Sequence, residues 1–138
     1  MTAKEWLNRG WKLNREIDAL LEEQRRALEL ATATTSAPQE DKVQGGEGNR
    51  TADKFANYAA YAAEIDSRID DLFQIKQEID QAIEKVENTT YRTLLIERYI
   101  NFKKWEQIAV DMDYSYVHIV RLHGKALQKV KDVIECYI

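Results

Sequence analysis

The chain has 138 residues, of which 44% are hydrophobic and 32% are charged, with one proline and five glycines. This length accommodates one ordinary domain, or a small domain with an extended helical element. No apolar run approaches the ~20 residues that span a bilayer, and the first residues lack the apolar stretch of a signal peptide. The single cysteine, Cys136, cannot form an internal disulfide. We therefore expect a cytoplasmic protein without a membrane partner.

The net charge of −4 is unevenly distributed along the chain. Residues 1–88 carry 12 basic and 18 acidic side chains, a net charge of −6, whereas residues 89–138 carry 8 basic and 6 acidic side chains, a net charge of +2. A weakly basic C-terminal part on an acidic body is compatible with nucleic-acid binding but does not require it.

Residues 2–31 are predicted to form one amphipathic helix. Apolar residues recur on one broad face, and the heptad column Leu7, Leu21 and Leu28 is joined there by Trp11, Ile17 and Leu20. Thr2 is placed to cap the start of this helix, with Glu5 completing a capping box. The tryptophans Trp6 and Trp11 are expected in the core of a helical hairpin or a dimer.

Residues 32–51 break the pattern, because threonine, serine, glycine and the only proline gather there, and they predict a flexible loop. Residues 52–87 predict a second, longer helix with two seven-spaced columns. The first column contains Ile65, Leu72, Ile79 and Val86. The second contains Ala62, Ile69 and Ile83, and Lys76 interrupts it. We expect residues 1–87 to form an antiparallel, coiled-coil-like hairpin. A lone hairpin buries little surface, so we also expect a homo-oligomer, with a dimer favoured.

Residues 88–138 are predicted to form a compact helix-turn-helix domain. Asn88 can cap a first helix, in which Leu94, Leu95 and Tyr99 face inward. A short helix from Lys103 to Met112 follows. Asp113 can adopt the left-handed conformation that the next turn needs, and Ser115 can cap the last helix. The buried stripe of that last helix is Ile119, Leu122, Ala126, Leu127, Val130 and Ile134.

In the C-terminal part, the segment RYINFKKWEQIAVDMDYSYVHIVRLHGKAL resembles region four of bacterial sigma factors, the module that reads the −35 promoter element. In that family an arginine-tyrosine pair ends one helix, an Ile-Ala pair lies in the next, and a serine opens the recognition helix, whose core ends with Ala-Leu. The matching residues here are Arg98-Tyr99, Ile108-Ala109, Ser115 and Ala126-Leu127.

The whole chain, from TAKEWLN to YSYVHIVRLHGKAL, is also similar to an uncharacterised family encoded by phages and prophages of Gram-positive bacteria. Proteins of that family are often described as phage transcriptional regulators. Together the two resemblances imply an all-α protein of the bacterial host cytoplasm that binds double-stranded DNA and regulates phage or prophage transcription. Because region-four modules also touch RNA polymerase, they imply polymerase as a further partner.

Carried onto matching positions, the resemblance assigns roles to nine residues. The base-facing candidates are Tyr116, Val117, Val120 and Arg121, and the phosphate candidates are Lys103, Lys104, Ser115, His118 and Lys125. Arg121 is the main polar base reader, because a guanidinium can bond guanine bidentately. Sigma factors usually place polar or basic residues where Val117 and Val120 stand, which puts strong −35-type specificity in doubt. The chain also lacks an aromatic-rich region-two signature, so it does not resemble a complete sigma factor.

Other functions have weaker support in the sequence. His118, His123 and Cys136 do not complete a zinc site, so no metal or cofactor is expected, and the two histidines are interpreted as surface or phosphate-facing groups. Nothing resembles a phosphate loop or a nucleophile motif, so an enzyme is not expected. Two alternatives to transcription regulation remain open, namely a coiled-coil interaction adaptor and a DNA-packaging factor of the small-terminase type.

Overall fold

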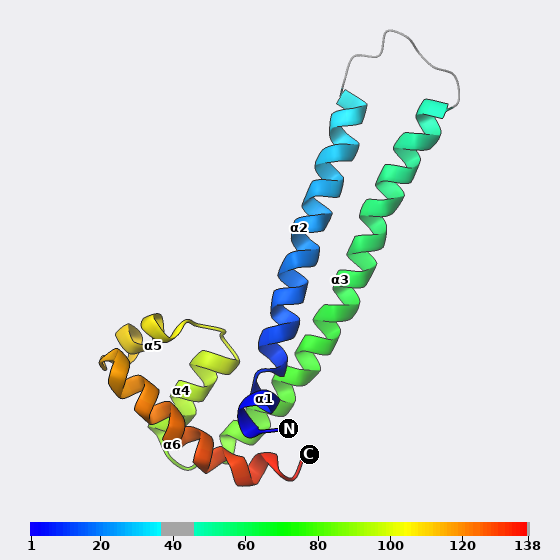
Figure 1. Ribbon diagram of the computed structural model, residues 1–138. Helices are drawn as coiled ribbons and strands as arrows, with labels where there is room; N and C mark the ends of the chain where they lie inside the picture. The colour runs from blue at the N-terminus through cyan, green and yellow to red at the C-terminus, as the bar shows by residue number, and fades with distance from the viewer. Residues whose placement is uncertain (37–45, 138) are drawn as a thin grey trace. The chain divides into compact units, whose positions relative to one another are not determined.

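The computed structural model describes residues 1–36 and 46–137, and these residues form six helices and no strand (Figure 1). The helices are α1 (Ala3–Leu7), α2 (Arg9–Ser36), α3 (Gly46–Glu84), α4 (Thr89–Tyr99), α5 (Trp105–Met112) and α6 (Tyr116–Ile134). The fold class is therefore all-α, as the sequence predicts.

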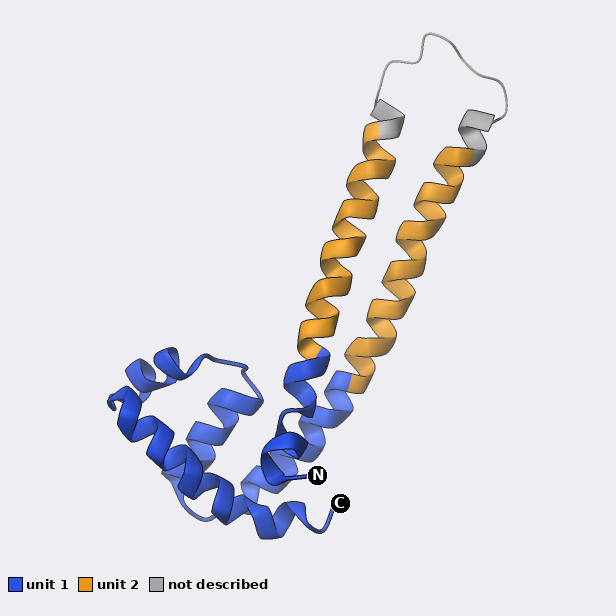
Figure 2. Cartoon of the chain, in the orientation of Figure 1, with its two compact units in different colours: residues 1–13, 72–138 blue, residues 14–71 orange. Residues whose placement is uncertain are grey.

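The chain divides into two compact units (Figure 2). Unit 1 comprises Met1–Leu13 and Leu72–Ile138, and unit 2 comprises Asn14–Asp71. This division differs from the boundary between residues 87 and 88 that the sequence suggests. The reason is that both ends of the expected hairpin sequence, α1 and the last turns of α3, contribute to the same core as α4, α5 and α6.

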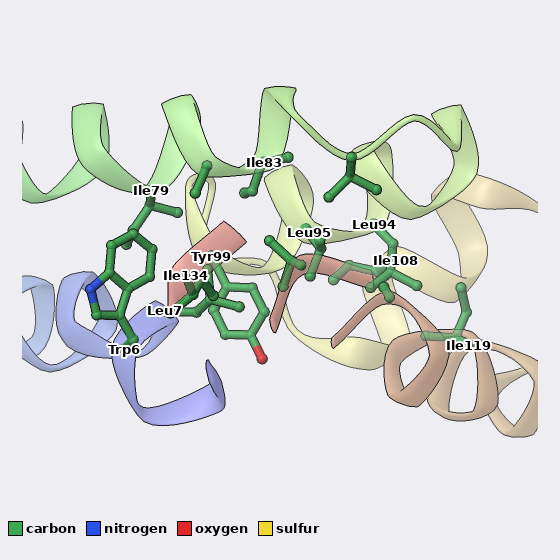
Figure 3. Packing of buried hydrophobic residues seen from close by; sticks show 14 of the residues in the cluster. Trp6, Leu7, Ile79, Ile83, Leu94, Leu95, Tyr99, Ile108, Ile119 and Ile134 are labelled. Atoms are coloured by element: carbon green, nitrogen blue, oxygen red, sulfur yellow. The ribbon is translucent and has the colours of Figure 1, made fainter. Parts of the chain in front are cut away.

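The core of unit 1 is built from side chains of five helices, which Figure 3 shows directed toward one another. The buried cluster consists of Trp6, Leu7, Ile79, Ala82, Ile83, Val86, Leu94, Leu95, Tyr99, Ile108, Ala109, Ile119, Ala126, Val130 and Ile134. The inward positions predicted for the first helix of the C-terminal part are thus confirmed. In the predicted stripe of α6, four residues are buried, and Leu122 and Leu127 pack partly buried against them. Burial of such side chains stabilises the fold by roughly 1.5–3 kcal/mol each.

The N-terminal segment is interrupted, so the prediction of one helix over residues 2–31 is wrong. The capping box is confirmed: the Thr2 hydroxyl accepts from the Glu5 N–H at 3.1 Å, and the Thr2 N–H donates to Glu5 Oε2 at 2.9 Å. However, α1 ends at Leu7, and Asn8 separates it from α2. Asn8 and the nearby Gly10 have low helix propensity. A Cβ at Gly10 would lie 3.5 Å from the Phe102 ring, which is an ordinary van der Waals distance, so packing against that ring does not require a glycine.

Both ends of the loop predicted over residues 32–51 are helical in the structure. Helix α2 continues to Ser36 and α3 begins at Gly46, whereas residues 37–45 lie outside the described part of the chain. In α2 the Thr32 hydroxyl donates to the Leu28 carbonyl at 2.8 Å, so this residue satisfies its polar group within the helix. At its other end α3 stops at Glu84, because the chain turns there with the Val86 N–H bonded to the Ile83 carbonyl.

In unit 2, α2 and α3 run side by side in opposite directions (Figure 1). An ion pair of 2.7 Å between Arg68 and Glu16 links the two helices. Of the predicted heptad columns, Ile65 is buried, but Leu21, Leu28 and Ile69 are exposed. The column that includes Leu21 and Leu28 is therefore wrong in unit 2. The buried side of α2 instead carries Ile17 and Ala31, two full heptads apart.

Candidate nucleic-acid interface

The turn between α5 and α6 has the local geometry that the sequence predicts. Asp113 ends α5 in the left-handed region, with φ 60° and ψ 42°, and the Tyr114 N–H donates to the Ala109 carbonyl at 2.9 Å. Ser115 then caps α6, where its Oγ accepts from the His118 N–H at 3.1 Å. A left-handed residue followed two positions later by a helix cap lets the chain change direction within a few residues.

The first two turns of α6 present the four base-facing candidates to solvent. Tyr116, Val117, Val120 and Arg121 are all exposed, whereas Ile119 in the same turns is fully buried. Val117 is the most exposed apolar side chain of the four, at 64%. Arg121 forms no ion pair with any residue that the structure describes, so its guanidinium is available for a ligand.

The start of α6 also has a favourable electrostatic character for an anion. Its first turn contains no acidic side chain, so nothing on the helix compensates the partial positive charge of the helix N-terminus. Ser115 uses its oxygen to accept the capping hydrogen bond, and its hydroxyl hydrogen remains able to donate. Lys125, two turns further along α6, is exposed.

The two lysines before α5 differ in their surroundings. Lys103 Nζ forms ion pairs with Glu97 and with Asp111, the latter at 2.9 Å. Hydrogen bonds to Glu97 and then to Asp111 raise the pKa of Lys103. Two carboxylates therefore compensate its charge, which makes it a poorer phosphate ligand than the sequence suggests. Lys104 is exposed at the N-cap of α5 and forms no ion pair among the described residues.

Tyr114 and His118 lie together at the surface of the same end of α6. Tyr114 is exposed, and its ring meets the His118 ring edge-on with centroids 4.6 Å apart. His118 itself is exposed, in agreement with its interpretation as a surface histidine. The aromatic contact holds its ring against the turn, close to the cap residue Ser115.

His123 is not a surface group, which corrects the interpretation from the sequence. Its side chain is buried, and its Nε2 and the Tyr99 hydroxyl share a hydrogen bond of 2.6 Å. Burial, and then the charges of Lys4 and Arg98, lower the pKa of His123 to about 4. Burial likewise raises the pKa of Tyr99 to about 12. The sequence does contain a signal for the burial of His123: it lies four residues after Ile119 and three before Ala126, on the buried stripe of α6.

Gly124, inside α6, lies in open space. A Cβ at this position would have no heavy atom within 4 Å. Packing inside the protein therefore does not require a glycine here, and the residue is exposed on α6 one turn after Val120.

Comparison with known proteins assigns the chain to a family. The chain belongs to the DUF1492 family, described as a protein of unknown function, whose sequence profile matches residues 32–131. The searches of curated proteins and of solved structures found no match.

Two features are absent from the residues that the structure describes. Among them, no helix has both the length and the apolar character needed to cross a membrane. No group of three or more His, Cys, Asp or Glu side chains in the described ranges is placed to hold a metal ion.

Proposed function

We propose that this protein binds duplex DNA in a sequence-specific manner and regulates the transcription of phage or prophage genes in the cytoplasm of a bacterial host. Helices α5 and α6 act as a helix-turn-helix that resembles sigma region four. The observation that carries the proposal is the start of α6. There, the cap by Ser115 and the buried side chain of Ile119 hold Tyr116, Val117, Val120 and Arg121 in solvent on adjacent turns.

In this proposal α6 enters the major groove with its first two turns. Arg121 donates two hydrogen bonds to a guanine edge, the pairing that a guanidinium makes best. Val117 and Val120 have no hydrogen-bonding groups, and they contact thymine methyl groups instead. Tyr116 combines an apolar ring with a hydroxyl that can bond a base or a phosphate. The site read by this surface therefore contains at least one guanine and neighbouring thymines.

Phosphate contacts fix the position of α6 on the duplex. Lys104 stands at the start of α5, and no side chain caps that helix, so its first amide groups are also available to a phosphate. Ser115, His118 and Lys125 hold further phosphates around α6. Lys103 contributes least, because Glu97 and Asp111 already neutralise its charge.

The protein acts as a homo-oligomer, with a dimer favoured, through the hairpin formed by α2 and α3. Exposed large apolar side chains on these helices support this part of the proposal, namely Leu21, Leu28, Phe55 and Ile69. A single pair of helices cannot cover them, because each helix offers only one stripe to its neighbour. RNA polymerase is a second protein partner, as in sigma region four.

A titration of labelled duplex DNA followed by fluorescence anisotropy at low salt tests the DNA-binding proposal. The probes come from a selected pool of random duplexes, and a shuffled duplex serves as the non-specific competitor. Arg121→Ala should lower discrimination against the shuffled duplex by ~1–3 kcal/mol. Lys104→Ala should weaken binding to both duplexes and reduce the salt dependence by about one counterion.

Lys129→Ala is the matched control for these variants. Lys129 is an exposed lysine on α6, but it lies about 20 Å further along the helix axis than Tyr116, at 1.5 Å per residue. Its removal should leave both the affinity and the specificity close to those of the wild type. Absence of duplex binding at low salt, or equal effects of all three variants, would contradict the proposal.

A second candidate function is that of an interaction adaptor. Val110 on α5 is 73% exposed, close in sequence to the exposed Val117 and Val120 on α6. Apolar side chains gathered at one end of two helices also suit a protein partner. A protein that ignores DNA but binds RNA polymerase would favour this function. Ring-sized assemblies in light scattering would instead favour a small-terminase type of packaging factor.

A further inference from the structure

Unit 1 contains a cavity of about 250 Å³ behind the first turns of α6. Its polar lining includes Lys4 and Asn8 from the N-terminal part of the chain and Arg98 from α4, and its apolar lining includes Trp105, Tyr116 and Val120. None of the lining residues is acidic. The cavity therefore combines two cationic side chains with an aromatic and aliphatic wall, although the chain as a whole is acidic.

Arg98 is held in place without a carboxylate partner among the described residues. Its guanidinium lies over the rings of Trp11 and Trp105, at 4.3 Å and 4.6 Å from their centroids. Nη1 donates to the Lys103 carbonyl at 2.9 Å. Burial lowers the pKa of Arg98, but an arginine remains charged at neutral pH. The charge of Glu106 acts on Arg98 and offsets part of this lowering, but no carboxylate among the described residues forms an ion pair or a hydrogen bond with Arg98. The two rings thus orient a cation whose remaining donors are not bonded to an acidic group.

The other polar groups of the cavity do not neutralise this charge. Lys4 is exposed and forms no ion pair within the described part of the chain. His123 and Tyr99 bond each other at 2.6 Å, and both are uncharged near pH 7, because their pKa values are about 4 and about 12. The lining of the cavity thus carries a charge of +2 from Lys4 and Arg98, with neutral hydrogen-bonding groups beside them. Glu106, outside the lining, offsets part of the charge of Arg98.

We propose that this cavity binds a small organic carboxylate, whose anionic group lies between Lys4 and Arg98 and whose apolar body contacts Trp105 and Val120. Ligand sites for drug-sized molecules usually measure ~300–1,000 Å³. A cavity of about 250 Å³ therefore suits a ligand of about the size of benzoate. A charged donor pair supplies orientation, and the apolar wall supplies most of the contact area.

Binding of this ligand has a consequence for DNA recognition. Tyr116 and Val120 line the cavity, and the proposed function places the same two residues against the bases. An occupied cavity therefore changes the DNA affinity, which gives the protein a small-molecule effector. This consequence rests on the proposed function, whereas binding of the carboxylate to the free protein does not.

Titration of the free full-length protein with sodium benzoate at constant ionic strength tests the site. Indole N–H resonances in a ¹H–¹⁵N spectrum report on Trp105, and calorimetry gives the affinity. We expect saturable binding with a shift of the Trp105 resonance. Benzyl alcohol, which has the ring but no charge, should bind at least roughly tenfold more weakly, because it lacks the charge-assisted hydrogen bonds. Inorganic phosphate tests whether the apolar body is needed.

Lys4→Gln is the decisive variant, because Lys4 is exposed and its loss leaves the core intact. It should weaken benzoate binding by roughly tenfold, whereas Lys12→Gln, at an exposed lysine away from the cavity, should leave binding unchanged. Equal affinities of the wild type and Lys4→Gln, tighter binding of phosphate than of benzoate, or no saturation would overturn the proposal. A protein that binds benzoate but no DNA would contradict only the proposed function.

Discussion

The helices of the two compact units have similar heptad-like patterns of apolar residues. The two units differ in how many of these apolar side chains they bury. Unit 1 encloses large side chains from five helices, among them Trp6, Leu94, Tyr99 and Ile134. Among the described residues of unit 2, the buried apolar side chains are Ile17, Ala31 and Ile65. A two-helix pair covers one stripe of each helix, whereas several helices that cross one another can surround a side chain completely.

A heptad column in the sequence does not by itself establish burial. Leu72, Ile79 and Val86 continue the column of Ile65 into unit 1, and all four are buried. Leu21 and Leu28 follow the same spacing in α2, and both are exposed. In unit 2 a helix buries only the stripe that faces the other helix, which includes Ile65 but not Leu21 or Leu28.

The largest expected effect is a contrast in stability between two leucine deletions. Leu94→Ala removes a fully buried side chain of unit 1, so it should lower the free energy of unfolding by about 2–5 kcal/mol. Leu21→Ala removes a side chain of unit 2 that is 45% exposed, and its effect should stay within about 0.5 kcal/mol. Urea unfolding of both variants measures the contrast. Equal losses of unfolding free energy in the two variants would contradict the prediction. A loss for Leu21→Ala that depends on protein concentration would place Leu21 in a subunit interface.

The second prediction concerns the pH dependence of unit 1. The pKa of His123 is lowered from 6.5 to about 4 in the folded protein. Between these two values the unfolded chain binds more protons, so the stabilisation is present above pH 6.5 and is lost as the pH falls toward 4. Because of His123, the free energy of unfolding should decrease by about 2 kcal/mol as the pH falls from 7 to 5.

Two histidine variants make this prediction specific. His123→Gln lacks the titrating group, so it should lose the pH-dependent decrease between pH 7 and pH 5. His118→Gln should keep it, because His118 is exposed. Chemical unfolding at the two pH values measures both variants. An unchanged pH dependence in His123→Gln would show that another group of the protein causes the decrease.

The smallest expected effect concerns the solvent-exposed side of α6. No other helix in the described part of the chain covers this side, as none covers the exposed apolar side chains of unit 2. Gly124→Ala adds a methyl group to open space, so helix propensity alone should raise the free energy of unfolding by ~1 kcal/mol. Thermal unfolding measures the change. A loss of stability would show that this exposed position has a contact in solution. Weaker DNA binding by the stabilised variant would place the DNA backbone near Gly124.

Several local features could be predicted from the sequence because a few neighbouring residues contain all of their physical causes. Thr2 and Ser115 each cap a helix through an amide group three residues further on, and Asp113 occupies the left-handed position that suits its short polar side chain. The stripe of α6 follows from its 3.6-residue period. These features also set the order of exposed and buried residues around Arg121.

Features that depend on distant residues were not predictable in the same way. The hydrogen bond of His123 joins it to Tyr99, 24 residues away, and the charge of Lys103 is compensated by Glu97 and Asp111. The cavity between Lys4 and Arg98 brings together segments from the two ends of the chain. A periodic pattern says which residues share a face, but not whether that face meets a core, a second helix or water.

The sequence alone therefore establishes an all-helical chain, its helix caps, and the turn before the four base-facing candidates, because backbone hydrogen bonding and helical periodicity act over a few residues. The tertiary structure decides that α1 joins the core of α4, α5 and α6, that Leu21 stays in solvent, and that His123 is buried. Those outcomes depend on which distant segments pack together, and the gain from burying apolar surface belongs to the whole assembly of helices rather than to any one of them.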